Sequence, residues 1–135
     1  MRVADTSYIA EGLLRRWDLF ETEQLLVPEL AIYEVENVVW KHEKLIGDVA
    51  EGVEYLETLG ELIRAGAITV VSYSEKLLKR AYTISIAHGV AIYDSIFLAL
   101  ALETGMELVT LDKDQMKLFE SERRERTGRT RKHSQ

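Results

Sequence analysis

GVAIYDSIFLALALETGMELVTLDKD, residues 89–114, is the stretch that decides the fold of this chain. Its apolar residues before the glycine at position 105 recur at helical spacing: Ile92, Ile96, Ala99, Leu100 and Leu102. Gly105 is a typical helix terminator, and the apolar run that follows it, Met106 to Thr110, is short enough to be a buried strand. The stretch therefore predicts a helix, a tight turn and a strand.

Two acids are placed at the ends of this apolar unit. Asp94 lies near the start of the predicted helix, where the positive end of the helix dipole favours a carboxylate. Asp112 lies two residues beyond the carboxyl end of the predicted strand. In open α/β sheets ligands bind beyond the carboxyl ends of the strands, so both acids occupy positions at which a site would form.

The rest of the chain alternates between short apolar runs and helical patterns. The runs at residues 2–4, 24–27, 67–71 and 107–110 predict four strands. Helical spacing predicts helices after residue 5, from 29 to about 44, from 48 to 64 and from 74 to 88. This alternation favours right-handed crossovers between parallel strands. We predict an α/β fold with a small doubly wound parallel sheet of about four strands and helices on both faces.

Length and composition limit the domain organisation. The chain has 135 residues, 47% of them apolar, which suits one domain with a substantial core. Residues 1–119 are predicted to form that domain, and residues 120–135, which have almost no apolar side chains, are predicted to be a disordered basic tail. Cysteine, a membrane-spanning run and a secretory segment are all absent, so we expect a cytoplasmic protein with no membrane partner.

The charge is divided unevenly. Residues 1–119 contain 11 Lys/Arg against 20 Asp/Glu, a net charge of −9, whereas residues 120–135 contain six against three, a net charge of +3. An acidic body repels nucleic acid, so a nucleic-acid function requires metal ions, local basic residues or the tail. For the tail, both a solvated end and an RNA contact stay open.

Four acids meet if the first and last strands are neighbours in the sheet. Asp5 and Asp112 would then project from adjacent carboxyl ends, and Glu34 and Asp94 would approach on helices that begin at the same edge. Clustered carboxylates repel one another unless a divalent cation lies among them, and hard oxygen ligands suit Mg²⁺ or Mn²⁺. The same residues also have ordinary interpretations as helix caps, a solvated helix residue and a turn former, and spacing alone favours neither.

Four strings of sequence resemble one family in order and approximate spacing. VADTSYIAEGLL, ELAIYEVENVVWKH, YDSIFLALALETG and LVTLDKD, which extend over residues 3–114, are similar to motifs of the PIN-domain family of metal-dependent ribonucleases. The resemblance implies an acidic quartet of catalytic metal ligands at Asp5, Glu34, Asp94 and Asp112. It further implies supporting roles for two hydroxyls and an amide, those of Thr6, Thr110 and Asn37.

Within this family, short single-domain chains resemble the VapC toxins of toxin–antitoxin pairs. That resemblance implies a Mg²⁺- or Mn²⁺-dependent endoribonuclease that cleaves a structured RNA such as tRNA or rRNA. It also implies a homodimer and a small antitoxin protein as inhibitor. Two departures stand out. No β-like run follows residue 114 to supply a fifth strand, which leaves two alternatives open, a short sheet edge or a helical end. Asp114 is a second choice to Asp112 as the last acid, and an outer-shell role is left open for it.

Other functions have less support in the sequence. A receiver-like or interaction module could use the same sheet without catalysis, but a receiver needs a second acid beside Asp5, where this chain has Thr6. A housekeeping RNA-processing nuclease of the same family stays open. His42, His88 and His133 have no partner at metal-ligand spacing. Three aromatic residues at helical spacing, Trp17, Tyr33 and Trp40, are expected to pack in the core rather than to form a platform for stacked bases.

Overall fold

The computed structural model describes the backbone of residues 1–133 and the side chains of residues 1–126. The elements in chain order are β1 (Arg2–Ala4), α1 (Thr6–Leu14), a 3₁₀ helix (Trp17–Phe20), β2 (Leu25–Pro28), α2 (Leu30–Lys41), a π-helical turn (His42–Ile46), α3 (Gly52–Arg64), β3 (Ile68–Val71), α4 (Glu75–His88), α5 (Ile92–Thr104), β4 (Leu108–Val109) and α6 (Lys113–His133). The four predicted strands are all present, each within a residue or two of its expected bounds.

The strands form one parallel sheet in the order β3-β2-β1-β4. Val3 in the central strand β1 pairs with Leu26 of β2 on one side and with Leu108 of β4 on the other. The chain therefore moves outward from β1 to β3 and then crosses back to β4, which makes the boundary between β1 and β4 the switch point of the sheet. This order is that of the first four strands of the doubly wound dinucleotide-binding fold and differs from the order of a receiver domain.

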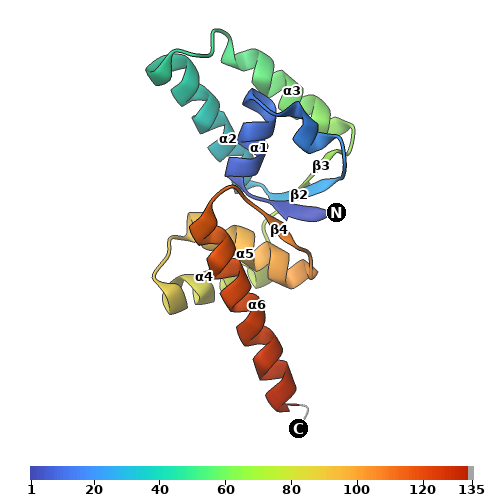
Figure 1. Ribbon diagram of the computed structural model, residues 1–135, viewed down its shortest axis with the longest axis vertical. Coiled ribbons are helices and arrows are strands. Elements are labelled where there is room, and N and C mark those ends of the chain that lie inside the picture. Colours follow the sequence, from blue (N-terminus) through green and yellow to red (C-terminus); the bar gives the residue numbers. More distant parts are fainter. Residues whose placement is uncertain (134–135) are drawn as a thin grey trace.

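Helices cover both faces of the sheet, as predicted (Figure 1). α1, α2 and α3 lie on one side, and α4, α5 and α6 lie on the other. α5 is the core helix of the second layer: it contacts β1 and β2, and every residue from Phe97 to Leu102 is buried. Gly105, with φ of 70°, ends α5 in the left-handed conformation and turns the chain into β4.

The chain after β4 continues as a helix where the sequence predicted a disordered tail from residue 120. Over residues 120–133 the chain is helical instead, and α6 packs on the domain through residues up to 126, whereas residues 134–135 of the predicted tail lie outside the described residues. Phe119 is buried to 1% exposure, which is worth about 1.5–3 kcal/mol. Further along α6, Arg123 forms an ion pair with Glu107 at 2.5 Å, and Arg126 donates to the carbonyl of Leu102 at 2.6 Å. A fifth strand is absent from the described residues, and α6 takes its place after β4.

Three aromatic residues that were expected in the core are exposed. Trp17, Tyr33 and Trp40 have exposed fractions of 49%, 68% and 51%. Tyr33 and Trp40 lie on α2, which packs on α1 and α3 and leaves these two rings exposed, and Trp17 lies in the 3₁₀ helix, where it contacts Phe20 edge-on.

Among the described residues, no single helix is both long and apolar enough to cross a membrane. α4 and α5 reach that length and apolar content only as a pair, with a bend of 120° where they meet.

Candidate functional site

Asp5 lies at the switch point, directly after β1. Its Oδ1 accepts hydrogen bonds from the backbone N–H of Tyr8 at 3.2 Å and from the hydroxyl of Ser7 at 2.6 Å, so Asp5 is the N-cap of α1. Its Oδ2 accepts a hydrogen bond from the hydroxyl of Thr110, just after β4. The cap interpretation that the sequence left open is thus correct for Asp5, and the same carboxylate also faces the end of the neighbouring strand.

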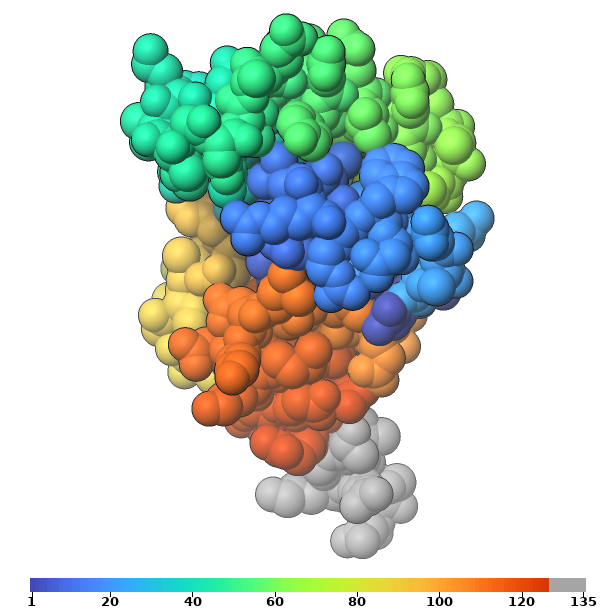
Figure 2. All heavy atoms as spheres, turned by 45° about the horizontal axis from the view of Figure 1, so that its top comes forward, coloured from blue at the N-terminus to red at the C-terminus, as the bar shows by residue number. Residues whose placement is uncertain are grey.

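Asp112 lies in the turn between β4 and α6. Its Oδ1 accepts hydrogen bonds from the backbone N–H groups of Asp114 at 2.9 Å and Gln115 at 3.2 Å, which is N-cap geometry for α6. The backbone N–H of Asp112 donates to the Thr110 hydroxyl at 3.0 Å, so Thr110 contacts both strand-end acids. Figure 2 shows the segment after β4, in orange, against the segment around α1, in blue.

Glu34 and Asp94 approach the same place from helices. Glu34 is in the second turn of α2, and its Oε1 accepts a hydrogen bond from the Thr6 hydroxyl at 2.7 Å. Asp94 is in the first turn of α5, and its side chain is exposed. Gln115 of α6 donates its amide to the backbone carbonyl of Asp94 at 2.8 Å, which joins the first turns of α5 and α6.

The charges of the four acids act on one another. The pKa of Glu34 is raised, chiefly by burial and further by the charges of Asp94 and Asp5, against the opposing effect of the Thr6 hydrogen bond. Although Asp94 is exposed as a whole residue, the partial burial of its carboxylate is the largest cause that raises its pKa, followed by the charges of Asp112 and Asp5. Each of the four predicted acids therefore takes part in the same electrostatic cluster at the carboxyl edge of the sheet.

The other predicted residues fall at different distances from this cluster. Thr6 and Thr110 make the hydrogen bonds described above. Asn37 is exposed on α2, three residues beyond Glu34, and lines the same hollow as Thr6 and Glu34. Asp114 is exposed in the first turn of α6. Its only hydrogen bond to Asp112 within the described part of the chain is donated by its backbone N–H, and its carboxylate takes no part in it.

Two residues that support the site were not found from the sequence. Ser7 donates to Asp5 and accepts a hydrogen bond from the backbone N–H of Leu111 at 3.0 Å, a contact between residues 104 positions apart. Gln115, 7% exposed, holds the carbonyl of Asp94. For Gln115 a local signal exists, because Asp112 and Gln115 have the spacing of a capping box. For Ser7 none exists, because its second partner comes from the far end of the chain.

We expect Ser7→Ala to lower the free energy of unfolding by about 1 kcal/mol, because one hydroxyl joins the ends of β1 and β4 and the exposed N–H of Leu111 can turn to water. Urea denaturation of the two proteins measures the difference. Ser72→Ala, an equal change at an exposed serine after β3, serves as the control and should leave the transition in place. Identical curves for the Ser7 variant and the parent would contradict a joining role.

Two groups in the structure have the chemistry to hold a metal ion. The quartet offers hard carboxylate oxygens whose mutual repulsion a divalent cation relieves, so its donor set fits Mg²⁺ or Mn²⁺. Among the described residues, however, the group whose ligand atoms all lie within 4.8 Å of one another is His88, Glu122 and Glu125. The ligand atoms of the quartet are more widely spaced than that.

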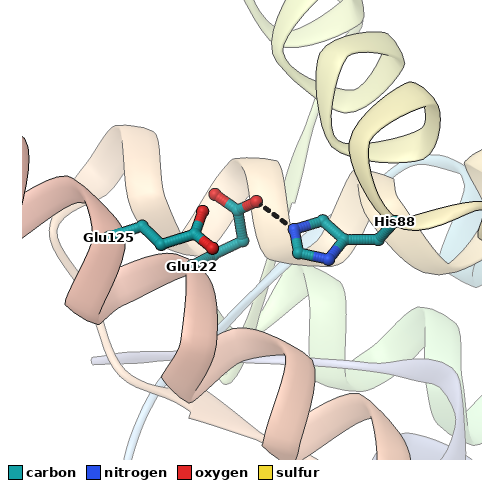
Figure 3. Close-up of side chains that lie close together, drawn as sticks. All are labelled: His88, Glu122 and Glu125. Carbon is teal, nitrogen blue, oxygen red and sulfur yellow. Dashed lines mark hydrogen bonds and ion pairs between the residues drawn. The ribbon is translucent and has the colours of Figure 1, made fainter.

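The His88 group joins α6 to the end of α4 (Figure 3). His88 is the last residue of α4, and its Nε2 lies 2.5 Å from Oε1 of Glu122, with both side chains partly buried. Glu125 follows one turn later on α6. The sequence shows no partner for His88 at metal-ligand spacing, and the fold brings Glu122 and Glu125 to it, because spacing along the chain does not show which helices meet. The contact holds α6 on the domain.

Comparisons with known proteins agree with the fold and identify the family. The family model described as the PIN domain matches residues 4–119. Ribonuclease VapC3 of Pyrobaculum aerophilum is 38% identical over 102 residues, which cover 73% of this chain and 74% of that protein.

Two solved structures share the fold. A crystal structure of a protein from Pyrobaculum aerophilum superposes with a TM-score of 0.69 at 21% identity, over 87% of this chain and 83% of that one. A toxin–antitoxin complex from Klebsiella pneumoniae contains a chain with a TM-score of 0.65 at 14% identity, over 85% of this chain and 89% of that one. With the family match over most of the domain and the identity to a VapC ribonuclease, the chain belongs to the PIN domain family.

Proposed function

We propose that this protein is a divalent-metal-dependent endoribonuclease, the toxin of a type II toxin–antitoxin pair. The observation that carries the proposal is the convergence of Asp5, Glu34, Asp94 and Asp112, from two strand ends and two helices, into one electrostatic cluster at the switch point. The identity to a VapC ribonuclease supports the reaction, hydrolysis of RNA phosphodiester bonds.

In this proposal the four acids hold Mg²⁺ or Mn²⁺. Such an ion, when bound, lowers the pKa of water and stabilises the negative charge on the attacked phosphodiester. The chain's own contribution is orientation: Thr6 holds one oxygen of Glu34, and Thr110 and Ser7 hold the two oxygens of Asp5. Among the described residues, no hydrogen bond engages Oε2 of Glu34, Oδ2 of Asp112 or either oxygen of Asp94, which leaves these atoms available as ligands.

Asn37 and Asp114 are proposed as supporting residues at the two sides of the quartet. Asn37 lies beside Glu34 on α2, where its amide can contact the RNA or a ligand's hydration shell. Asp114 follows Asp112, with which it shares the first turn of α6, and can accept hydrogen bonds from metal-bound water.

The partners follow from the same family. The structural neighbour from Klebsiella pneumoniae is a toxin–antitoxin complex, which supports a small antitoxin protein as partner and inhibitor. We further propose a structured RNA such as tRNA or rRNA as substrate, a homodimer as the active form, and the cytoplasm as the compartment.

The experiment that tests the function is cleavage of total cellular RNA by the purified protein with Mg²⁺ or Mn²⁺, followed by mapping of the new RNA ends. The expected result is a small set of discrete cleavage positions, because an endoribonuclease toxin acts on chosen sites. RNA that stays intact with either ion would contradict the proposed activity, and uniform degradation would contradict the toxin assignment.

A further inference from the structure

A hollow of about 380 Å³ lies beside the quartet on α2. Its lining comprises Thr6, Tyr33, Glu34, Asn37, Val38 and Lys41. Two of these residues, Thr6 and Glu34, form the hydrogen bond that orients one acid of the quartet. The hollow therefore begins at the proposed site of hydrolysis and extends along the helix away from the sheet.

Three side chains in this hollow form a stripe without partners. Tyr33, Asn37 and Lys41 follow one another at intervals of four residues, so they share one side of α2. All three are exposed, and Tyr33 at 68% is among the most exposed large side chains of the described residues. Within the described part of the chain, neither the Asn37 amide nor the Lys41 ammonium makes a hydrogen bond or ion pair.

The chemistry of the stripe matches a nucleotide. The face of an aromatic ring stacks on any base, an amide can bond the edge of a base, and an ammonium neutralises a phosphate. Lys41 is the only cation in the lining of this hollow. Because residues 1–119 carry a net charge of −9, a cation beside the acidic quartet is a local exception to a surface that repels RNA.

The adjoining side of α2, which faces α3, has a different character. A second hollow, of about 440 Å³, shares Tyr33 and Asn37 but is otherwise lined by two glutamates, Glu36 and Glu43, and by apolar residues that include Trp40. Its lining contains no cation, so it repels phosphate groups and suits a protein surface better than RNA. The side of α2 that bears Lys41 is the one that an RNA strand can follow.

We propose that Tyr33, Asn37 and Lys41 form the subsite for the nucleotide next to the cleaved phosphodiester, with the base stacked on Tyr33 and its phosphate paired with Lys41. The inference rests on the proposed function and adds the residues that bind its substrate. Lys41 lies two helical turns, about 10 Å along the axis, beyond Glu34, so one strand can reach both the stripe and the quartet.

Tyr33→Ala tests the stacking contact. Binding of a labelled oligouridylate is measured with Ca²⁺ in place of Mg²⁺, so that the RNA is not consumed during the titration. We expect affinity to fall by about fivefold to a hundredfold, whereas Tyr33→Phe, which keeps the ring, should bind like the parent. Tyr82→Ala is the matched control, since Tyr82 is a similarly exposed tyrosine on α4, and it should have no effect.

Lys41→Met tests the phosphate contact through salt dependence. We expect the slope of log affinity against log salt to decrease by about 0.7, the value for one phosphate contact with a single strand. Lys79→Met removes the same charge from α4, where Lys79 pairs only with Glu75 among the described ion pairs, and the slope should then be unchanged. In cleavage assays both substitutions on α2 should raise KM more than they lower kcat. The reason is that the native residues Tyr33 and Lys41 are proposed to bind the substrate and not the ion.

The outcomes separate the subsite from the activity. If the parent cleaves RNA and both α2 variants bind RNA as well as it does, the subsite is wrong and the nuclease stands. If the parent neither binds nor cleaves RNA, the proposed function fails and the subsite fails with it. If the variants bind RNA normally and lose affinity only for a co-expressed antitoxin, the stripe is a protein-binding surface and the nucleotide proposal is overturned.

Discussion

Asp94→Asn will reduce RNA cleavage by at least about a hundredfold and leave the protein folded. Replacing a residue that only supports a metal ligand lowers metal affinity or activity by about 10–100-fold, and Asp94 is proposed to be a ligand itself. The asparagine keeps the size of the side chain, so no cavity forms in the first turn of α5. Cleavage rates for the two proteins at saturating Mn²⁺ or Mg²⁺ measure the effect.

A matched control separates catalysis from general loss of charge. Asp18→Asn makes the same chemical change at an exposed residue whose ion-pair partner is Arg16, and it should cleave RNA like the parent. If Asp94→Asn instead keeps its activity and unfolds at a lower temperature, Asp94 is a structural residue at the start of a helix and the metal assignment is wrong.

The same variant also bears on stability without metal. Because the pKa of Asp94 is raised in the folded state by burial and by Asp112 and Asp5, its ionised form is disfavoured there. A carboxyl whose pKa is raised by folding binds its proton more tightly in the folded state. Its contribution to the free energy of unfolding is therefore fully present at pH values below the unfolded pKa and is lost as pH increases through the folded pKa. At neutral pH with EDTA, Asp94→Asn should thus be as stable as the parent or up to about 1 kcal/mol more stable, since exposed charges interact weakly.

The parts of the fold that the sequence predicts are those governed by local patterns. The unit of α5, Gly105 and β4 follows from helical spacing, a terminator and a short apolar run within one stretch of 26 residues. The meeting of Asp5 with Asp112 then required only that β1 and β4 be neighbours, which the sheet order confirms. Acids at strand ends are predictable because the register of a parallel sheet fixes the edge at which they emerge.

A helix after residue 114 was only one of two alternatives in the sequence, because the composition from residue 120 favoured disorder. Charged residues dominate after Lys117, and such segments usually lack enough apolar surface to fold. What stabilises α6 is one buried ring, that of Phe119, together with contacts to distant residues such as the 2.5 Å pair between His88 and Glu122. These contacts depend on tertiary structure, so only the cap at Asp112 and Gln115 was visible in the sequence.

The exposure of the aromatic residues of α2 was also misjudged, for a geometric reason. Helical spacing shows that Tyr33 and Trp40 have defined sides on α2, but whether anything covers a side depends on which elements pack against the helix. Because α2 packs on α1 and α3 and leaves these two rings exposed, they are available for partners. The error in core assignment is therefore informative about function.

Removal of divalent metal will stop cleavage completely, and Mn²⁺ or Mg²⁺ will restore it. The quartet fits hard cations. Without the ion, Glu34 and Asp94, whose pKa values are raised first by burial and then by neighbouring acids, have no positive charge among the described side chains to pair with. The assay is cleavage of one defined RNA after EDTA treatment and dialysis, followed by titration with each ion in turn.

Calcium gives the sharper result, because it tests geometry as well as charge. Ca²⁺ takes 6–8 oxygen ligands at about 2.3–2.6 Å, whereas Mg²⁺ requires an octahedron at about 2.0–2.1 Å, so Ca²⁺ should bind the acids but position water poorly. We expect Ca²⁺ to compete with Mg²⁺ and to inhibit while raising the melting temperature of the protein, as a ligand of the folded state does. The Asp94→Asn variant should show a much smaller thermal shift. Cleavage that survives EDTA, or a shift that is equal in the variant, would show that the four acids do not act as the metal site of a nuclease.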